Sequence, residues 1–265
     1  MGVEMKTRRN GLKFASRSFL ILIAVTALFF STQSLVAQEA ALQQQRESGL
    51  SKHPWQYGVF VQGGFPPDYW ISTYTDPNLY LNAKLQLFSA GFEAGKQTRR
   101  FEGPMPLRGR GEAMLEATPF WLARYPPQSI AQFEANEEPT PVTVPYQWNG
   151  DNFHGASVTP FLLRWNFSQR DSSRVVPWAQ FGGGLVWTDH KFPLYFNQAK
   201  DQFENSTSVI NFTPQVGAGV NIFNRPRHSA NIAMKVIHIS NASLGDHNPG
   251  LNFTFQFSAG YSWWK

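Results

Sequence analysis

Residues 251–264 read LNFTFQFSAGYSWW and alternate between two kinds of side chain. The odd positions are apolar and mostly aromatic, from Leu251 and Phe253 to Tyr261 and Trp263, and the even positions are mostly Asn, Thr, Gln, Ser and Gly. Because successive side chains on a β-strand point to opposite faces, the stretch predicts a strand with one aromatic face and one uncharged polar face. An aromatic face toward lipid and small polar side chains toward a narrow lumen are typical of a transmembrane β-barrel.

A secreted β-sandwich is the alternative fold. Its outward faces would usually carry Lys and Glu, and the last strand has neither on its polar side. The chain also ends almost at once after Trp263–Trp264, as the C-terminal strand of an outer-membrane barrel does, although Lys265 departs from the usual aromatic last residue.

Eight segments have the composition and alternation of strands. An even number of strands suits a closed antiparallel barrel, which leaves no backbone group unpaired in lipid. The predicted fold is therefore an all-β, eight-stranded antiparallel outer-membrane barrel. Its predicted strands are 55–63, 80–97, 108–125, 154–168, 175–188, 209–223, 229–241 and 251–264.

The connections between these segments alternate in length. Residues 64–79, 126–153 and 189–208 are long connections, whereas 169–174 and 224–228 are short, polar and turn-like. Outer-membrane barrels have short periplasmic turns and longer external loops. The alternation predicts that both ends of the barrel chain lie on the periplasmic side.

The first 37 residues have the pattern of a signal peptide. Five Lys and Arg residues precede an apolar run, residues 19–30, and small residues follow it up to Ala37. The run is shorter than the roughly 20 residues of a membrane-spanning helix. We expect export with cleavage near Ala37, a polar N-terminal arm at 38–54 and a barrel domain at 55–265, with retention of the leader as an anchor as the alternative.

Charge and cysteine content exclude several classes of function. The leader holds five of the 23 basic residues and one of the 18 acidic residues, so the rest of the chain is nearly neutral and has no basic patch for nucleic acid. The chain has no Cys, which excludes disulfides, thiolate catalysis and a lipidated cysteine anchor. We expect no nucleic acid partner, contact with outer-membrane lipids and a monomer.

Residues 238–252, HISNASLGDHNPGLN, carry the candidate chemistry. On the strand at 229–241, Lys235 should face the lumen, because a cation facing lipid at mid-membrane costs roughly 2–4 kcal/mol. The even positions then face lipid, and His238 and Ser240 lie together on that face near its external end. Polar groups facing the membrane are expensive and often functional.

A His two residues from a Ser can act as a general base that activates the hydroxyl for attack on an ester. Acyl transfer also needs a hydrogen-bond donor for the developing oxyanion, and the amide of Asn241 is a candidate. Asn248, in the turn 245–250, is placed to brace the site. The alternative is a polar hairpin rim at the membrane interface, with no catalytic role.

The same stretch resembles the signature of the lipid A 3-O-deacylase family, known as PagL-type or acyloxyacyl hydrolases. PWAQFGGGLVW, residues 177–187, is similar to another strand of that family, and the resemblance covers roughly 155–264. The family fold is an eight-stranded outer-membrane barrel. The resemblance implies deacylation of lipid A in lipopolysaccharide as the activity, with no metal or organic cofactor.

The resemblance also implies roles for individual residues. His238 would be the general base, Ser240 the nucleophile, Asn241 the oxyanion donor and Asn248 a recurrent turn residue. The family's third triad member, a Glu that orients the histidine, falls at Asn252 in this chain. Asn can hold the ring through its side-chain oxygen but cannot stabilise the imidazolium as a carboxylate does, so a slower triad is expected.

Strict alternation raises a difficulty for this triad. Asn252 would belong to the lumen face of its strand, whereas His238 would face lipid, and only a bulge or turn would bring the two together. The implied function is therefore a serine esterase acting through an acyl-enzyme, and the alternative is an inactive structural or lipid-binding barrel.

Overall fold

The computed structural model describes residues 54–67, 84–98, 101–130, 146–168, 173–197, 202–205, 208–244 and 251–265. The chain divides into two units, 1–44 and 45–265, and all described residues belong to the second. The predicted leader, and all of the predicted arm before Pro54, lie outside the described residues. No helix in the described part is long and apolar enough to cross a membrane.

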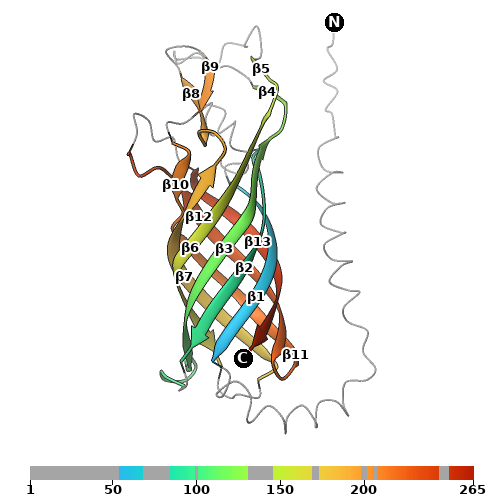
Figure 1. Ribbon diagram of the computed structural model, residues 1–265, viewed down its shortest axis with the longest axis vertical. Helices are drawn as coiled ribbons and strands as arrows, with labels where there is room; N and C mark the ends of the chain where they lie inside the picture. Colours follow the sequence, from blue (N-terminus) through green and yellow to red (C-terminus); the bar gives the residue numbers. More distant parts are fainter. Residues whose placement is uncertain are drawn as a thin grey trace, which may run out of the picture. The chain divides into compact units, whose positions relative to one another are not determined.

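Eight antiparallel strands form one closed ring (Figure 1). Each strand pairs with the next around the ring, and β6 and β7 pair to close it, so the sandwich alternative is wrong. The ring consists of β1 (Trp55–Phe65), β2 (Gln86–Gln97), β3 (Gly109–Tyr125), β6 (Asp151–Phe167), β7 (Val175–Thr188), β11 (Gln215–Arg225), β12 (His228–Ile239) and β13 (Leu251–Trp264). Closure pairs the backbone groups that an open edge would leave exposed to lipid.

The first and last strands of the ring lie side by side. The amide of Trp55 donates to the carbonyl of Lys265 at 2.9 Å, and the amide of Lys265 donates back at 2.8 Å. Both ends of the barrel chain therefore lie at the same end of the barrel, together with the short β11–β12 turn, as the loop lengths predicted.

The largest differences between the predicted and observed strand boundaries lie at two places. The second strand begins at Gln86 rather than at residue 80. The predicted strand 209–223 is divided at Thr213 and Pro214 into β10 (Ile210–Phe212) and β11, although both pieces keep one register with β7. Two small hairpins were not predicted: β4 (Gln128–Ile130) with β5 (Tyr146–Trp148), and β8 (Leu194–Asn197) with β9 (Gln202–Asn205).

The lumen is filled with paired polar and charged side chains. Arg164 donates to Glu93 at 3.0 Å, and Lys235 pairs with Glu116 at 2.5 Å. Lys235 is 3% exposed, so its predicted orientation toward the lumen is confirmed. Because a buried charge is costly unless it is paired, these ion pairs make a charged interior possible.

A cluster of apolar side chains, called the apolar plug, fills the end of the lumen that lies away from the short β11–β12 turn. Phe192, from the connection after β7, packs edge-on against Trp121 and Phe153, with ring centroids 5.3 and 5.0 Å apart. Ile237 and Ile239 of β12 belong to the same buried cluster. The inner side of β12 next to His238 therefore packs against hydrocarbon.

The outer face of the ring is apolar. Along β12 the outward positions below His238 are Ala230, Ile232, Met234 and Val236. Large exposed apolar side chains continue around the barrel, which is the outer face expected of an outer-membrane barrel. They include Val59, Val61, Phe88, Phe92, Phe161, Phe181, Val216 and Phe257.

Candidate active site on the outer barrel wall

His238 and Ser240 lie together on the outer side of the wall. The Nε2 atom of His238 is 2.9 Å from the Oγ atom of Ser240, which is hydrogen-bonding distance. Their positions alternate with Ile237 and Ile239, which face the plug inside the barrel. An imidazole at this distance can accept the hydroxyl proton and so activate the oxygen as a nucleophile.

Regular pairing with β10 and β11 holds the backbone of this pair. The amide of His238 donates to the carbonyl of Pro214 at 3.0 Å. Ser240 and Phe212 exchange two backbone bonds, of 2.7 and 3.2 Å. Pro214 has no amide hydrogen, so it interrupts the strand assignment without shifting the register.

The register arranges the outward residues near the pair in rows across three strands. Phe181, Val216 and Val236 form one row. Leu185, Phe212 and Ser240 form another. Between them lies a row in which Gly183 stands opposite Pro214, and Pro214 opposite His238. The middle row rises less above the wall because Gly183 has no side chain. A Cβ built at Gly183 would have the Cα of Pro214 as its nearest neighbour, at 3.8 Å.

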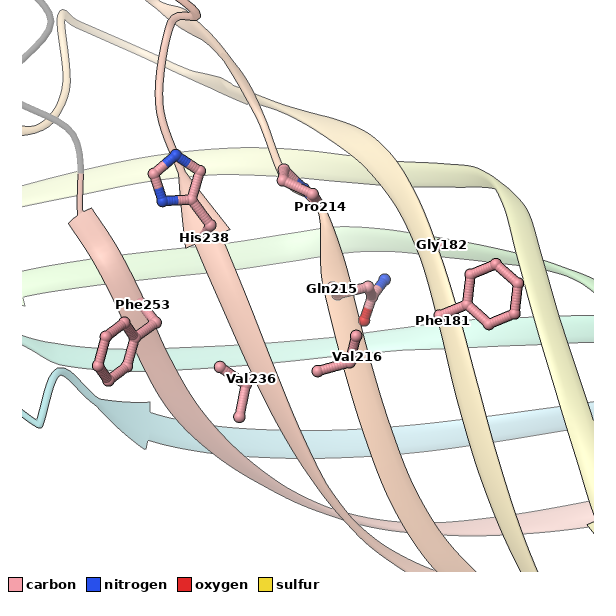
Figure 2. Close-up of a pocket in the computed structure, with 8 residues that line it drawn as sticks. All are labelled: Phe181, Gly182, Pro214, Gln215, Val216, Val236, His238 and Phe253. Carbon is pink, nitrogen blue, oxygen red and sulfur yellow. The ribbon is translucent and has the colours of Figure 1, made fainter.

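A groove runs between Pro214 and His238 of this middle row and the row of Phe181, Val216 and Val236 (Figure 2). Its volume is about 370 Å³, and His238 lies at one end of it. Phe181, Val216 and Phe253, which line it, are 61%, 55% and 39% exposed, so the groove opens to the outside of the barrel. The lining consists of Phe181, Gly182, Pro214, Gln215, Val216, Val236, His238 and Phe253.

Sequence reasoning missed this groove. The available signal was the position of Gly183 in an outward stripe that otherwise carries Phe181, Leu185 and Trp187.

A bulge in β13 lies opposite His238. Ile237 pairs with Thr254 and Ile239 with Leu251, so two residues of β13, Asn252 and Phe253, face the single residue His238. A bulge is the irregularity that strict alternation required here, and it places the backbone of Asn252 opposite His238. The side chain of Asn252 is outside the described part of the structure.

The bulge also corrects one prediction. Leu251 was placed on the aromatic outer face, but it is 1% exposed and belongs to the plug inside the barrel. The extra residue at Asn252–Phe253 reverses the side to which every position before it points. Phe253 and the odd positions after it keep the predicted outward orientation.

Asn241 begins the turn that follows β12. Its side-chain oxygen accepts a hydrogen bond from the amide of Ser243 at 3.0 Å, and Ala242 and Ser243 have φ of 53° and 60°. Asn241 is 1% exposed. Its side-chain oxygen accepts within the turn, and its Nδ2 atom is the group that could donate to an oxyanion. Asn248 lies outside the described residues.

His190 forms a separate polar cluster with two aspartates near the start of β6 and the end of β7. Nδ1 of His190 is 2.8 Å from Asp189, and Nε2 is 3.3 Å from Asp151. The His190 ring also stacks on Phe153, with centroids 4.0 Å apart. These interactions occupy both ring nitrogens and one face of the His190 ring within the wall and rim of the barrel.

Part of the chain matches a known protein family. The model of lipid A 3-O-deacylase (PagL) matches residues 136–262. No curated protein sequence matches the chain.

Three solved structures have a weak likeness to the chain. The outer membrane enzyme PagL is 15% identical, with a TM-score of 0.43, over 77% of this chain and 97% of that one. The outer membrane protein OprG from Pseudomonas aeruginosa is 10% identical, with a TM-score of 0.43, over 80% and 95%. Neisserial surface protein A is 12% identical, with a TM-score of 0.32, over 79% and 94%.

The assignment rests on the family model, which spans both residues of the outward pair. Residues 136–262, just under half of the chain, therefore match the model of the lipid A 3-O-deacylase (PagL) family.

Proposed function

We propose that this protein is an outer-membrane serine esterase that removes an ester-linked acyl chain from lipid A. The observation that carries the proposal is the 2.9 Å contact between Ser240 and His238, where His238 also lines an apolar groove on the outer wall of the barrel. An ester of a membrane lipid reaches such a site by lateral movement within the bilayer. Its hydrocarbon chain matches the groove, since both are apolar.

The reaction begins when the Ser240 oxygen attacks the ester carbonyl while Nε2 of His238 takes the hydroxyl proton. The tetrahedral intermediate collapses, the bond to the sugar oxygen breaks, and His238 returns the proton to that oxygen. The acyl chain is then esterified to Ser240. Water, deprotonated by His238, attacks this ester, and a free fatty acid leaves as Ser240 regains its proton.

Two asparagines complete the proposed machinery. Asn241 is the candidate donor for the oxyanion, where a single donor is commonly worth a factor of about 10²–10³ in rate. Asn252 is the candidate orienting residue, with its side-chain oxygen accepting from Nδ1 of His238. The proposed tautomer of His238 therefore carries hydrogen on Nδ1 and leaves Nε2 to accept from serine.

The test compares wild type with Ser240→Ala and His238→Ala in an outer membrane. Lipid A is extracted and its acyl chains are counted by mass spectrometry. We expect loss of one acyl chain in the wild type and full acylation with either variant. Heat-modifiable migration of all three proteins on detergent gels controls for folding and insertion.

The Asn at position 252 favours a second candidate, an inactive barrel that binds lipid or supports the membrane. Under this alternative, lipid A is identical in wild type and both variants although all three proteins fold. That result would contradict the esterase proposal for lipid A.

A further inference from the structure

The carbonyl of Ile237 belongs to the peptide bond that ends at the amide nitrogen of His238. The bulge at Asn252–Phe253 interrupts the β12–β13 ladder just after the Ile237–Thr254 pair. At this point the hydroxyl of Thr254 donates to the Ile237 carbonyl at 3.1 Å. Thr254 is 0% exposed and lies on the lumen side of the wall, opposite the lipid-facing groove.

Two more side chains continue this hydrogen bonding into the barrel. The amide of Gln256 donates to the Thr254 hydroxyl at 3.2 Å, and the amide of Gln62 donates to the Gln256 oxygen at 2.6 Å. Both glutamines are buried, at 2% and 8% exposure. Successive hydrogen bonds in a low-dielectric interior polarise and strengthen one another. We call this chain of hydrogen bonds, Gln62–Gln256–Thr254–Ile237, the inner relay.

The peptide preceding His238 is therefore held from both neighbouring strands. Its nitrogen donates to Pro214 on one side at 3.0 Å, and its oxygen accepts from Thr254 on the other. A backbone held in this way has little freedom to rotate. The orientation of the His238 side chain depends directly on that backbone.

We propose that Thr254 is a positioning residue for His238, acting through the inner relay from inside the barrel while the reaction takes place outside it. The inference rests on the proposed function for its catalytic consequence but not for its structural one. Thr254 adds a side-chain hydrogen bond to this peptide at the point where the ladder becomes irregular. It thereby keeps the imidazole in reach of Ser240 where the neighbouring strand, β13, is bulged.

The test uses Thr254→Val, which keeps the shape and removes the hydroxyl, and Thr254→Ser, which keeps the hydroxyl. Ser258→Ala is the matched control, since Ser258 is another buried hydroxyl on the inner face of β13. The first readout is the NMR signal of the His238 ring in detergent-solubilised protein, assigned by its loss in His238→Ala. The second is kcat and KM for deacylation of lipid A.

We expect Thr254→Val to shift the His238 ring signal and to lower kcat about tenfold with little change in KM, because small misplacements of a catalytic group are costly. Thr254→Ser should restore both values, and Ser258→Ala should change neither. If Thr254→Val does not fold, Gln256→Met, which removes the next bond of the inner relay, should shift the same signal and lower kcat less.

The outcomes separate the two proposals. An active wild type whose Thr254→Val variant has an unchanged ring signal and kcat would overturn the positioning role. An inactive wild type whose ring signal moves in Thr254→Val but not in Ser258→Ala would support the inner relay and contradict the esterase. Loss of stability in Thr254→Val without a change in kcat would reduce Thr254 to a structural residue.

Discussion

Gly183 on β7 stands opposite Pro214, and a Cβ added at Gly183 would lie 3.8 Å from the Cα of Pro214 with no nearer neighbour. This open space lies next to the groove, which is lined by Gly182 of β7 and by Pro214. Since a side chain fits here without a backbone clash, groove depth can be changed without disturbing the barrel.

Gly183→Leu should fill the groove and weaken binding of the acyl chain. We expect kcat/KM for lipid A to fall at least about tenfold, the loss typical of a blocked hydrophobic pocket, with less effect on a short-chain ester. The measurement is deacylation kinetics on both substrates. Ala179→Leu, which adds the same side chain to an outward position of β7 outside the groove, is the control. Equal rates for all three proteins would show that the groove holds no substrate.

The Lys235–Glu116 pair should contribute strongly to stability. Both side chains are buried, at 3% and 4% exposure, so Lys235→Met leaves a carboxylate in the lumen without its cation. We expect a loss of about 3–5 kcal/mol in the free energy of unfolding, measured by urea titration with tryptophan fluorescence in lipid vesicles. The double variant Lys235→Met/Glu116→Gln should recover most of that loss. A single variant as stable as wild type would contradict the prediction.

Phe192 should be a principal residue of the apolar plug. It is 0% exposed and contacts the rings of Trp121, Tyr125 and Phe153. Phe192→Ala leaves a cavity and should lower the free energy of unfolding by about 3–5 kcal/mol. Leu244→Ala, at a position 79% exposed, should change it by less than about 0.5 kcal/mol. Similar values for the two variants would indicate that the plug is dispensable.

The barrel could be predicted because its constraints repeat along the chain. Alternation and the lengths of connections predicted all eight ring strands, and the predicted and observed bounds of 175–188 and 251–264 agree. The lumen orientation of Lys235 followed from the cost of a charge in lipid. The pairing of His238 with Ser240 followed from their spacing of two residues.

The bulge and the groove could not be predicted in the same way. A bulge depends on how two strands are joined at one position, and nothing in the composition of Asn252 and Phe253 marks the extra residue. The groove depends on which residue of β7 meets Pro214, and this register comes from pairing between segments about 30 residues apart. The plug depends on where Phe192 folds back, which alternation along a strand cannot indicate.

Asn252→Glu should increase activity. The resemblance implies a Glu of the family at this position, and the bulge places the backbone of residue 252 opposite His238. A carboxylate stabilises the imidazolium that forms as Ser240 attacks, whereas an amide cannot. In a serine protease, replacing the triad Asp with Asn lowers kcat by a factor of about 10⁴. We expect kcat for lipid A to rise by at least about tenfold, measured by initial rates of fatty acid release. Asn252→Gln, which has the same length as Glu but no charge, is the control and should not exceed wild type. If both variants have the wild-type rate, residue 252 is not the third member of the triad, and the orienting group must come from elsewhere in the chain.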